Sequence, residues 1–215
     1  KLTTVPTAVG ALQANGCEMQ LDDGVTIEGA DKSDIDVLRM WRDREPGLQR
    51  VWQGDDPRSW KGVDFDGNRV VELNLDGNKL TSVPAEIGQL TSLVKLKLLK
   101  NRLKSLPAEI GQLTSLRELY LENSKLTSVP AEIGQLTSLE RLRLSGNQLT
   151  SMPAEIGQLT SLEMLGLQGN RLTSLPAEIG QLTALTELYL QGNWLTNVPA
   201  EIGQLTSLRV LNLQA

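Results

Sequence analysis

The sequence predicts an α/β solenoid, a curved stack of coils with a parallel sheet on its concave face and short helical or turn segments on its convex face. One observation is a 23-residue stretch that returns with a nearly constant frame. A second is that each stretch alternates like a short strand and then continues through a proline and a glycine. A third is that only 3% of the residues are aromatic although 40% are hydrophobic, which suits coils that repeat one aliphatic residue at each stacked position. A fixed period of this size indicates stacked units and no single globular core.

The first half of each repeat predicts a strand. In the repeat that begins at Leu139, the residues Leu139, Leu142 and Leu144 point inward and the residues between them point outward. Successive copies should therefore pair as a parallel sheet. Positions are counted from the first residue of each repeat, and these first residues are Val70, Leu93, Leu116, Leu139, Leu162, Leu185 and Leu208.

The second half of each repeat predicts a return segment along the opposite face. Residues 153–159 begin with Pro153, which cannot join a strand ladder, and reach a turn residue near Gly157. Ile156 and Leu159 should point inward. Strands ~4.8 Å apart, backed by bulkier return segments, make the stack curve with the sheet on the inside.

An asparagine column predicts a polar ladder at position nine. A buried amide must be satisfied, and an Asn here can bond the backbones of neighbouring coils. The third repeat has Ser124 at this position, and its shorter side chain predicts a water or a local distortion. The ladder residues are Asn78, Asn101, Asn147, Asn170 and Asn193.

Residues 31–69 do not repeat and predict a helix-plus-hairpin cap at the N-terminal end of the array. Ser33 can cap a helix whose apolar residues recur at three-residue steps, namely Ile35, Leu38 and Trp41, and Pro46 should end it after Glu45. Residues 61–65, a turn at 66–68 and residues 69–75 predict a hairpin that leads into the first repeat. Trp41, Trp52 and Trp60 would cover the open end of the core by bulk; the alternative is a ligand cage.

Residues 70–215 resemble the leucine-rich repeats of 23 residues with an LPxxIxxLxxL second half. Such repeats occur in plant intracellular Ras-group-related proteins and in algal, protist and bacterial proteins. The segment Trp60-Lys61-Gly62-Val63, with residues 69–73, is similar to the N-terminal cap of plant-type leucine-rich repeats without its cysteines. The resemblance implies a curved solenoid that binds proteins, and it names no ligand.

Residues 1–30 are expected to be a C-terminal-cap-like repeat remnant and a linker. Residues 1–12, KLTTVPTAVGAL, match the second half of a repeat, as in KLTSVPAEIGQL at 79–90, and Ala215 stands at position eight of the last repeat. The phase therefore runs from the last residue into the first. Three explanations stay open: the chain is part of a longer tandem array, its residue order is permuted, or copies dock head to tail through residues 1–30 and the last repeat. The hypothesis is that residues 1–12 form the coil after a seventh repeat, in this chain or in a neighbour.

Composition restricts the chemistry. The chain has no His, which excludes imidazole catalysis and His-containing metal sites, and its net charge of -5 argues against a nucleic-acid partner. Cys17, the single cysteine, has no His partner that could activate it as a nucleophile, and the sequence has no Gly-rich phosphate loop. No catalytic residue, metal or cofactor is therefore predicted. The acidic run that includes Asp22, Asp34 and Asp36 is interpreted as a solvated linker, with weak Ca²⁺ binding as the alternative.

Two further absences bear on compartment and membrane. The chain has one Cys, no disulfide-bonded caps and no Asn-x-Ser/Thr sequon, which leans toward an intracellular, reducing location. No run of 18 apolar residues exists, so no transmembrane segment is expected.

The outward strand positions vary in charge and size while the frame stays constant, which favours binding over packing. We therefore expect a non-enzymatic module that recognises a protein partner with its concave face; the alternative is a structural component that assembles head to tail with itself or within a larger complex. Exposed Tyr and Met on a rigid sheet offer contact area at low entropic cost, and Arg can pair with acidic groups. The candidate contacts are Lys95, Lys97, Arg117, Tyr120, Arg141, Arg143, Met164, Tyr189 and the rim residue Trp194.

The second repeat is locally basic, with Lys95, Lys97, Lys100, Arg102 and Lys104 close together. This cluster could attract an acidic protein, a phosphate-bearing ligand or an anionic membrane surface. The simpler interpretation is a solvated, partly paired face.

Overall fold

The computed structural model describes residues 4–5, 26–27 and 33–214, within two compact units that span Lys1–Ser33 and Asp34–Ala215. In the first unit, strand β1 (Thr4–Val5) pairs in parallel with β2 (Thr26–Ile27). The predictions for the rest of residues 1–30, including the coil expected after the seventh repeat, Cys17 and most of the acidic run, lie outside the described residues.

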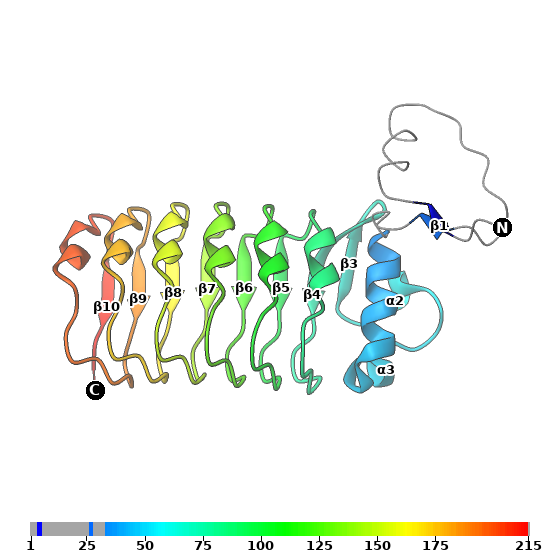
Figure 1. The fold of residues 1–215 in the computed structure, drawn as a ribbon, viewed down its shortest axis with the longest axis horizontal. Helices are drawn as coiled ribbons and strands as arrows, with labels where there is room; N and C mark the ends of the chain where they lie inside the picture. The colour runs from blue at the N-terminus through cyan, green and yellow to red at the C-terminus, as the bar shows by residue number, and fades with distance from the viewer. Residues whose placement is uncertain (1–3, 6–25, 28–32, 215) are drawn as a thin grey trace, which may run out of the picture. The chain divides into compact units, whose positions relative to one another are not determined.

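The second unit is a row of stacked coils preceded by two helices (Figure 1). Its sheet has the strand order β10-β9-β8-β7-β6-β5-β4-β3, in which β4 to β10 are parallel and β3 is antiparallel to β4. This arrangement confirms the predicted solenoid. The strands are β3 (Val63–Asp66), β4 (Arg69–Asn74), β5 (Lys95–Lys97), β6 (Glu118–Tyr120), β7 (Arg141–Arg143), β8 (Met164–Gly166), β9 (Glu187–Tyr189) and β10 (Val210–Asn212).

Each coil returns through a 3-10 helix with the sequence Ala-Glu-Ile-Gly-Gln. A proline with φ near -70° precedes each one, as Pro153 does with φ -68°, and the inward Ile156 and Leu159 are fully buried. The predicted return segments are thus confirmed as short helices. They are η2 (Ala85–Gln89), η3 (Ala108–Gln112), η4 (Ala131–Gln135), η5 (Ala154–Gln158), η6 (Ala177–Gln181) and η7 (Ala200–Gln204).

The glycine within each 3-10 helix has a different structural role from the turn expected from the sequence. A turn position that depends on glycine would have a positive φ, which Gly134 does not have; a Cβ placed on it would lie 2.6 Å from the carbonyl oxygen of Glu155 in the next coil. These glycines therefore let adjacent coils approach closely. The left-handed turn lies instead at position eight, where Gly146 has a φ of 66°.

The Asn ladder is visible in four coils. The Oδ1 of Asn147 accepts a hydrogen bond from the backbone N–H of Leu126 at 3.1 Å, and its Nδ2 donates to the carbonyls of Leu121 and Leu144, both at 2.9 Å. Each amide thus joins its own coil to the preceding one. Asn101, Asn170 and Asn193 make the equivalent bonds.

Asn78 departs from the ladder and Ser124 interrupts it. Asn78 makes none of these side-chain bonds among the described residues, because helix α3 (Pro46–Val51) occupies the place of a preceding coil. A Cβ on Gly47 of α3 would lie only 1.9 Å from the carbonyl oxygen of Asn78. The Oγ of Ser124 is buried and has no hydrogen-bond partner in the described part of the chain, so Leu103 lacks the bond that Leu126 receives from Asn147.

The N-terminal cap consists of two helices and a hairpin. Helix α2 (Asp34–Arg44) begins directly after Ser33 and buries Val37, Leu38 and Trp41. It ends at Arg44, and Pro46 opens the separate helix α3, which the sequence did not predict; a proline at the first helical position loses no hydrogen bond. The hairpin is confirmed as β3 and β4, with Asp66 paired to Arg69.

The three tryptophans of the cap lie in the core, so the ligand-cage alternative is wrong. Trp41, Trp52 and Trp60 are 1%, 1% and 3% exposed. The Trp52 ring stacks on Trp60 with centroids 4.8 Å apart and meets Trp41 edge to face at 6.4 Å. Their bulk covers the end of the leucine core, as the sequence predicts.

Two buried carboxylates join the cap to the first repeat. The Oδ2 of Asp34 accepts from the backbone N–H of Val70 at 2.6 Å, and Arg69 lies 3.4 Å from its Oδ1. Asp34 is 2% exposed, so its interpretation as part of a solvated linker is wrong. The carboxylate of Glu45, 4% exposed, accepts from the backbone and hydroxyl groups of Thr81 and Ser82.

No helix in the described part of the chain is long and apolar enough to cross a lipid bilayer.

Candidate ligand-binding face

The outward side chains of β4 to β10 form one surface, here called the sheet face. Each three-residue strand from β5 to β7 buries its central leucine and leaves its two flanking residues half exposed. The parallel register places Lys95 beside Glu118 and Glu118 beside Arg141. Side chains 23 residues apart in sequence are therefore direct neighbours across the sheet.

In the N-terminal half of the sheet face, the predicted charged contacts pair with one another. Glu118 lies between Lys95, at 2.7 Å, and Arg141, at 3.0 Å. Lys97 lies 3.5 Å from Glu72, and Arg117 pairs with Glu140. These cations are already partnered within the protein, which reduces what they offer to a ligand.

The protonation of this cluster follows from its contacts. Burial alone would raise the pKa of Glu118, but hydrogen bonds from Lys95, Tyr120 and Arg141 together hold it below its ordinary value. The hydrogen bond to Glu118 raises the pKa of Lys95 above its ordinary value. The pair is therefore ionised across the neutral range.

Tyr120 is fixed in the middle of this cluster. Its hydroxyl donates to Glu118 at 2.9 Å, and the Arg143 guanidinium lies 5.4 Å from the centre of its ring. Burial and the bond to Glu118 raise the pKa of the Tyr120 hydroxyl. Tyr120 thus offers a ring held in place to a ligand, whereas its hydroxyl is already bonded to Glu118.

The C-terminal half of the sheet face carries a hollow. Gly166 has no side chain and stands between Arg143 and Tyr189 in the strand register, which leaves a cavity of about 230 Å³. Met164 lines it and accepts a contact from Arg143 Nε at 3.4 Å. The complete lining is Glu122, Arg143, Met164, Gly166, Gln168, Tyr189 and Gln191.

The floor of this hollow contains polar residues that the strand columns did not predict. Glu122 Oε2, Gln168 Oε1 and Gln191 Oε1 are buried and have no hydrogen-bond partner among the described residues. Burial raises the pKa of Glu122, although Arg143 lies 3.9 Å away. All three stand at position seven, just beyond the strand, and a polar run in that column was the available signal.

Trp194 lies at the rim of the C-terminal half and is 62% exposed, the highest value among the exposed large hydrophobic residues. The Arg171 guanidinium lies 5.9 Å from the centre of its ring. Tyr189 is held by a 2.9 Å bond from its hydroxyl to Glu187. The hydrogen bond to Glu187 raises the pKa of the Tyr189 hydroxyl.

The basic cluster of the second repeat divides into two parts. Lys95 and Lys97 lie on the sheet face and are paired, as described above. Lys100, Arg102 and Lys104 are exposed and form no ion pair among the described residues. The basic cluster is therefore partly paired, as predicted. Its strand residues Lys95 and Lys97 are neutralised by ion pairs, whereas the three exposed cations form none among the described residues.

A chain of stacked strand and 3-10 coils, with a constant leucine core and a variable sheet face, is a repeat solenoid. The family described as "Leucine-rich repeat region" matches residues 72–147 and 141–215. The chain belongs to the leucine-rich repeat family. No curated protein matches it significantly.

Solved structures agree with this assignment. A leucine-rich repeat protein of Leptospira interrogans is 45% identical over 65% of this chain and 42% of its own, with a TM-score of 0.53. The ectodomain of the Arabidopsis receptor kinase HAESA, solved with an IDA peptide hormone ligand, is 33% identical over 84% of this chain and 32% of its own, with a TM-score of 0.74. The ectodomain of SOBIR1 from Arabidopsis thaliana is 26% identical over 79% of this chain and 97% of its own, with a TM-score of 0.66. The chain thus spans less than half of the Leptospira and HAESA chains.

Proposed function

We propose that the chain is a non-enzymatic recognition module that binds a peptide or protein segment on the C-terminal half of its sheet face. The observation that carries this proposal is the hollow at Gly166, whose polar floor has buried acceptors without a hydrogen-bond partner among the described residues. The exposed Trp194 belongs to the same repeat as Tyr189 and Gln191, which line the hollow. Leucine-rich repeat domains commonly bind proteins, and HAESA was solved with a peptide hormone, which supports a ligand of this kind.

The contrast between the two halves of the sheet face determines where binding energy is available. A ligand at Lys95 or Arg141 would have to compete with Glu118, whose ion pairs are in place. A ligand over Met164 and Tyr189 would cover apolar surface and could donate hydrogen bonds to the floor. Buried acceptors without partners cost roughly 1 to 3 kcal/mol each, so satisfying them favours binding.

The proposal is tested by selecting peptides from a random displayed library against the full chain and measuring their affinities for variants. Tyr189→Ala and Trp194→Ala should each weaken binding by about tenfold or more, because Tyr and Trp side chains carry much of the energy of such interfaces. Thr160→Ala, an exposed residue after η5 and away from the strands, is the matched control. Binders that tolerate both aromatic substitutions but lose affinity with the control would contradict the proposal.

A second candidate function, head-to-tail assembly, is supported by the last repeat. Leu211 and Leu213 are 41% and 45% exposed, whereas their equivalents Leu188 and Leu190 one repeat earlier are at most 1% exposed. A further coil packed on β10 would bury them, and residues 1–12 of a second copy have the sequence of such a half-coil. Light scattering after size exclusion should then give a mass that rises with concentration, while a constant monomer mass would exclude this function.

A further inference from the structure

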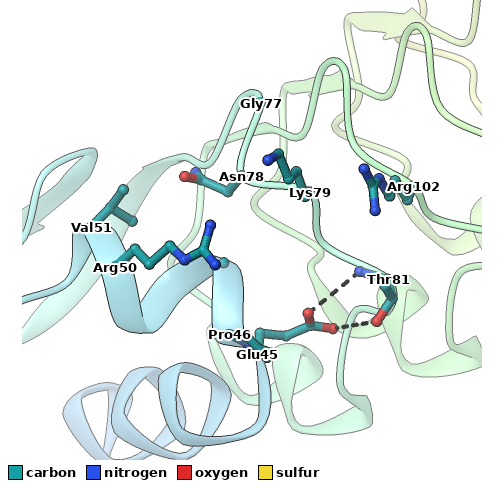
Figure 2. A pocket seen from close by; sticks show the side chains of 10 residues that line it. Glu45, Pro46, Arg50, Val51, Gly77, Asn78, Lys79, Thr81 and Arg102 are labelled. Atoms are coloured by element: carbon teal, nitrogen blue, oxygen red, sulfur yellow. Dashed lines mark hydrogen bonds between the residues drawn. The ribbon is translucent and has the colours of Figure 1, made fainter.

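A second pocket lies away from the sheet face, between α3 and the loops that follow β4 and β5. Figure 2 shows the side chains that line it. Its volume is about 510 Å³. Three cationic side chains from three separate segments line it: Arg50 from α3, Lys79 from the first loop and Arg102 from the second. We call it the rim pocket.

The three cations have no acidic partner among the described residues. None of them forms an ion pair or a side-chain hydrogen bond there, and all three are exposed. Glu45 is the one carboxylate in the lining, and it already accepts four bonds from Thr81 and Ser82, of which Figure 2 shows those from Thr81. Three positive charges and one negative charge leave the lining with a net charge of +2.

The backbone holds one of these cations in an unfavourable conformation. Lys79 has a φ of 60°, in the left-handed region, whereas its equivalents Arg102 and Lys125 in the next repeats do not. Helix α3 packs closely on this segment, where a Cβ on Gly47 would meet the carbonyl oxygen of Asn78. A non-glycine residue pays about 1 kcal/mol for this conformation, which fixes the start of the Lys79 side chain beside the pocket.

We propose that the rim pocket binds a phosphate group, either as free phosphate or as a phosphomonoester. Two guanidinium forks and one ammonium supply many donors to tetrahedral oxygens, and Arg bonds phosphate in a bidentate manner. A dianionic phosphate matches the +2 lining, whereas a carboxylate would leave one charge uncompensated. Lys100, Lys104 and Lys125, which form no ion pair among the described residues, add to the positive potential that draws an anion to this rim.

The test uses the full chain, labelled with ¹⁵N and titrated with inorganic phosphate at constant ionic strength. Backbone signals of Gly47, Gly77 and Lys79 should shift and saturate. Arg50→Gln and Arg102→Gln should each weaken phosphate binding by about tenfold. Lys125→Gln removes the same charge from the next loop along the rim, outside the pocket, and should change the affinity by less than about twofold.

A further variant separates binding from folding. Lys79→Gly relieves the left-handed strain, so it should raise the midpoint of thermal unfolding while weakening phosphate binding. Equal losses in Arg102→Gln and Lys125→Gln, or chloride shifts as large as those of phosphate, would show nonspecific ion attraction and overturn the proposal.

The source of the phosphate is distinguished by two further titrations, one with glycerol phosphate and one with phosphatidylcholine vesicles that contain phosphatidic acid. Binding of glycerol phosphate supports the proposal with a soluble ester as ligand, and additional binding of the vesicles, lost in Arg102→Gln, supports it with a lipid headgroup. Vesicle binding without any binding of soluble phosphate contradicts it, because a pocket formed by three side chains must recognise the group itself. None of these outcomes depends on the sheet face.

Discussion

Ser124 shows how one side chain can interrupt the hydrogen bonds between stacked coils. The four ladder amides each make bonds to two coils, but the buried Ser124 hydroxyl makes none with the described residues. The backbone of the adjacent coil at Leu103 is the group that loses its partner. The interruption lies in the third repeat, between the bonds made by Asn101 and those made by Asn147.

Replacing this serine should therefore stabilise the protein. Ser124→Asn restores the ladder and is expected to raise the free energy of unfolding by about 1 kcal/mol and the thermal midpoint by about 3 °C. The reverse change, Asn147→Ser, should lower the free energy of unfolding by about 1 to 3 kcal/mol. Urea unfolding of both variants provides the measurement, and changes of the same sign in the two would refute the ladder argument.

Glu122 gives a prediction about pH. Burial raises its folded-state pKa above the ordinary value of 4.5. As pH rises, the Glu122 carboxyl therefore loses its proton at a lower pH in the unfolded state than in the folded state. The free energy of unfolding should then fall as pH rises from 4.5 through the folded-state value, and it should stay reduced above that value. Glutamine occupies the same position in later repeats, at Gln168 and Gln191, so Glu122→Gln is a conservative test.

Glu122→Gln should abolish this contribution. At neutral pH the variant should unfold at a higher urea concentration than the native chain, and the difference should vanish below the ordinary carboxyl pKa. Glu118→Gln is the opposite control, because the folded-state pKa of Glu118 is lowered. The stability from Glu118 is present above its ordinary pKa and is lost as pH falls through the folded value, so that variant should be less stable at neutral pH. Identical pH profiles for both variants would contradict these assignments.

At the scale of elements, the 3-10 helices pack on one another through their glycines. A methyl group on Gly134 would meet Glu155 O at 2.6 Å, whereas a methyl group on Gly203 in η7 would meet no described atom within 4 Å. Gly134→Ala should therefore destabilise the chain by about 1 to 3 kcal/mol. Gly203→Ala should be neutral or slightly stabilising, because it only restricts the unfolded chain. Thermal unfolding of the two variants distinguishes close packing from a turn requirement, which would make both changes costly.

The elements that recur with the 23-residue period could be predicted from the sequence. The strands, the return helices and the inward residues such as Leu142 and Ile156 repeat in every coil, and the same local forces act on each copy. Helix α3 could not be predicted, because a short segment after Pro46 carries no periodic signal and is held by its contact with Asn78. Six complete coils and a seventh strand reinforce one another, while a single irregular element depends on its tertiary neighbours.

The sheet face was predicted only as a set of positions. The columns identified which side chains point outward, but not that Glu118 would pair with both Lys95 and Arg141, since partners lie in adjacent repeats and depend on side-chain geometry. Position seven was overlooked because it lies beyond the strand. The hollow needs a missing side chain at Gly166 together with Gln168 and Gln191, which no single column reveals.

At the scale of the whole molecule, the two ends of the described solenoid differ. At one end the cap buries Trp41 and Trp52 and bonds Val70 through Asp34. At the other, η7 has no buried residue and Leu211 is exposed. In a stack where each coil contacts only its neighbours, a coil supported on one side opens more readily than one supported on both.

Hydrogen exchange should reveal this gradient. The backbone N–H groups of Arg141 in β7 and Val210 in β10 donate to equivalent carbonyls at the same 3.0 Å distance, so any difference in exchange reports the stability of the coil and not of the bond. Val210 should exchange much faster than Arg141, and Val70 should be as protected as the central coils. Equal rates at Val210 and Arg141 in dilute protein would mean that the array unfolds as one unit. If copies dock on β10, protection at Val210 alone should increase with protein concentration, since a second chain then supplies the support that the last coil lacks.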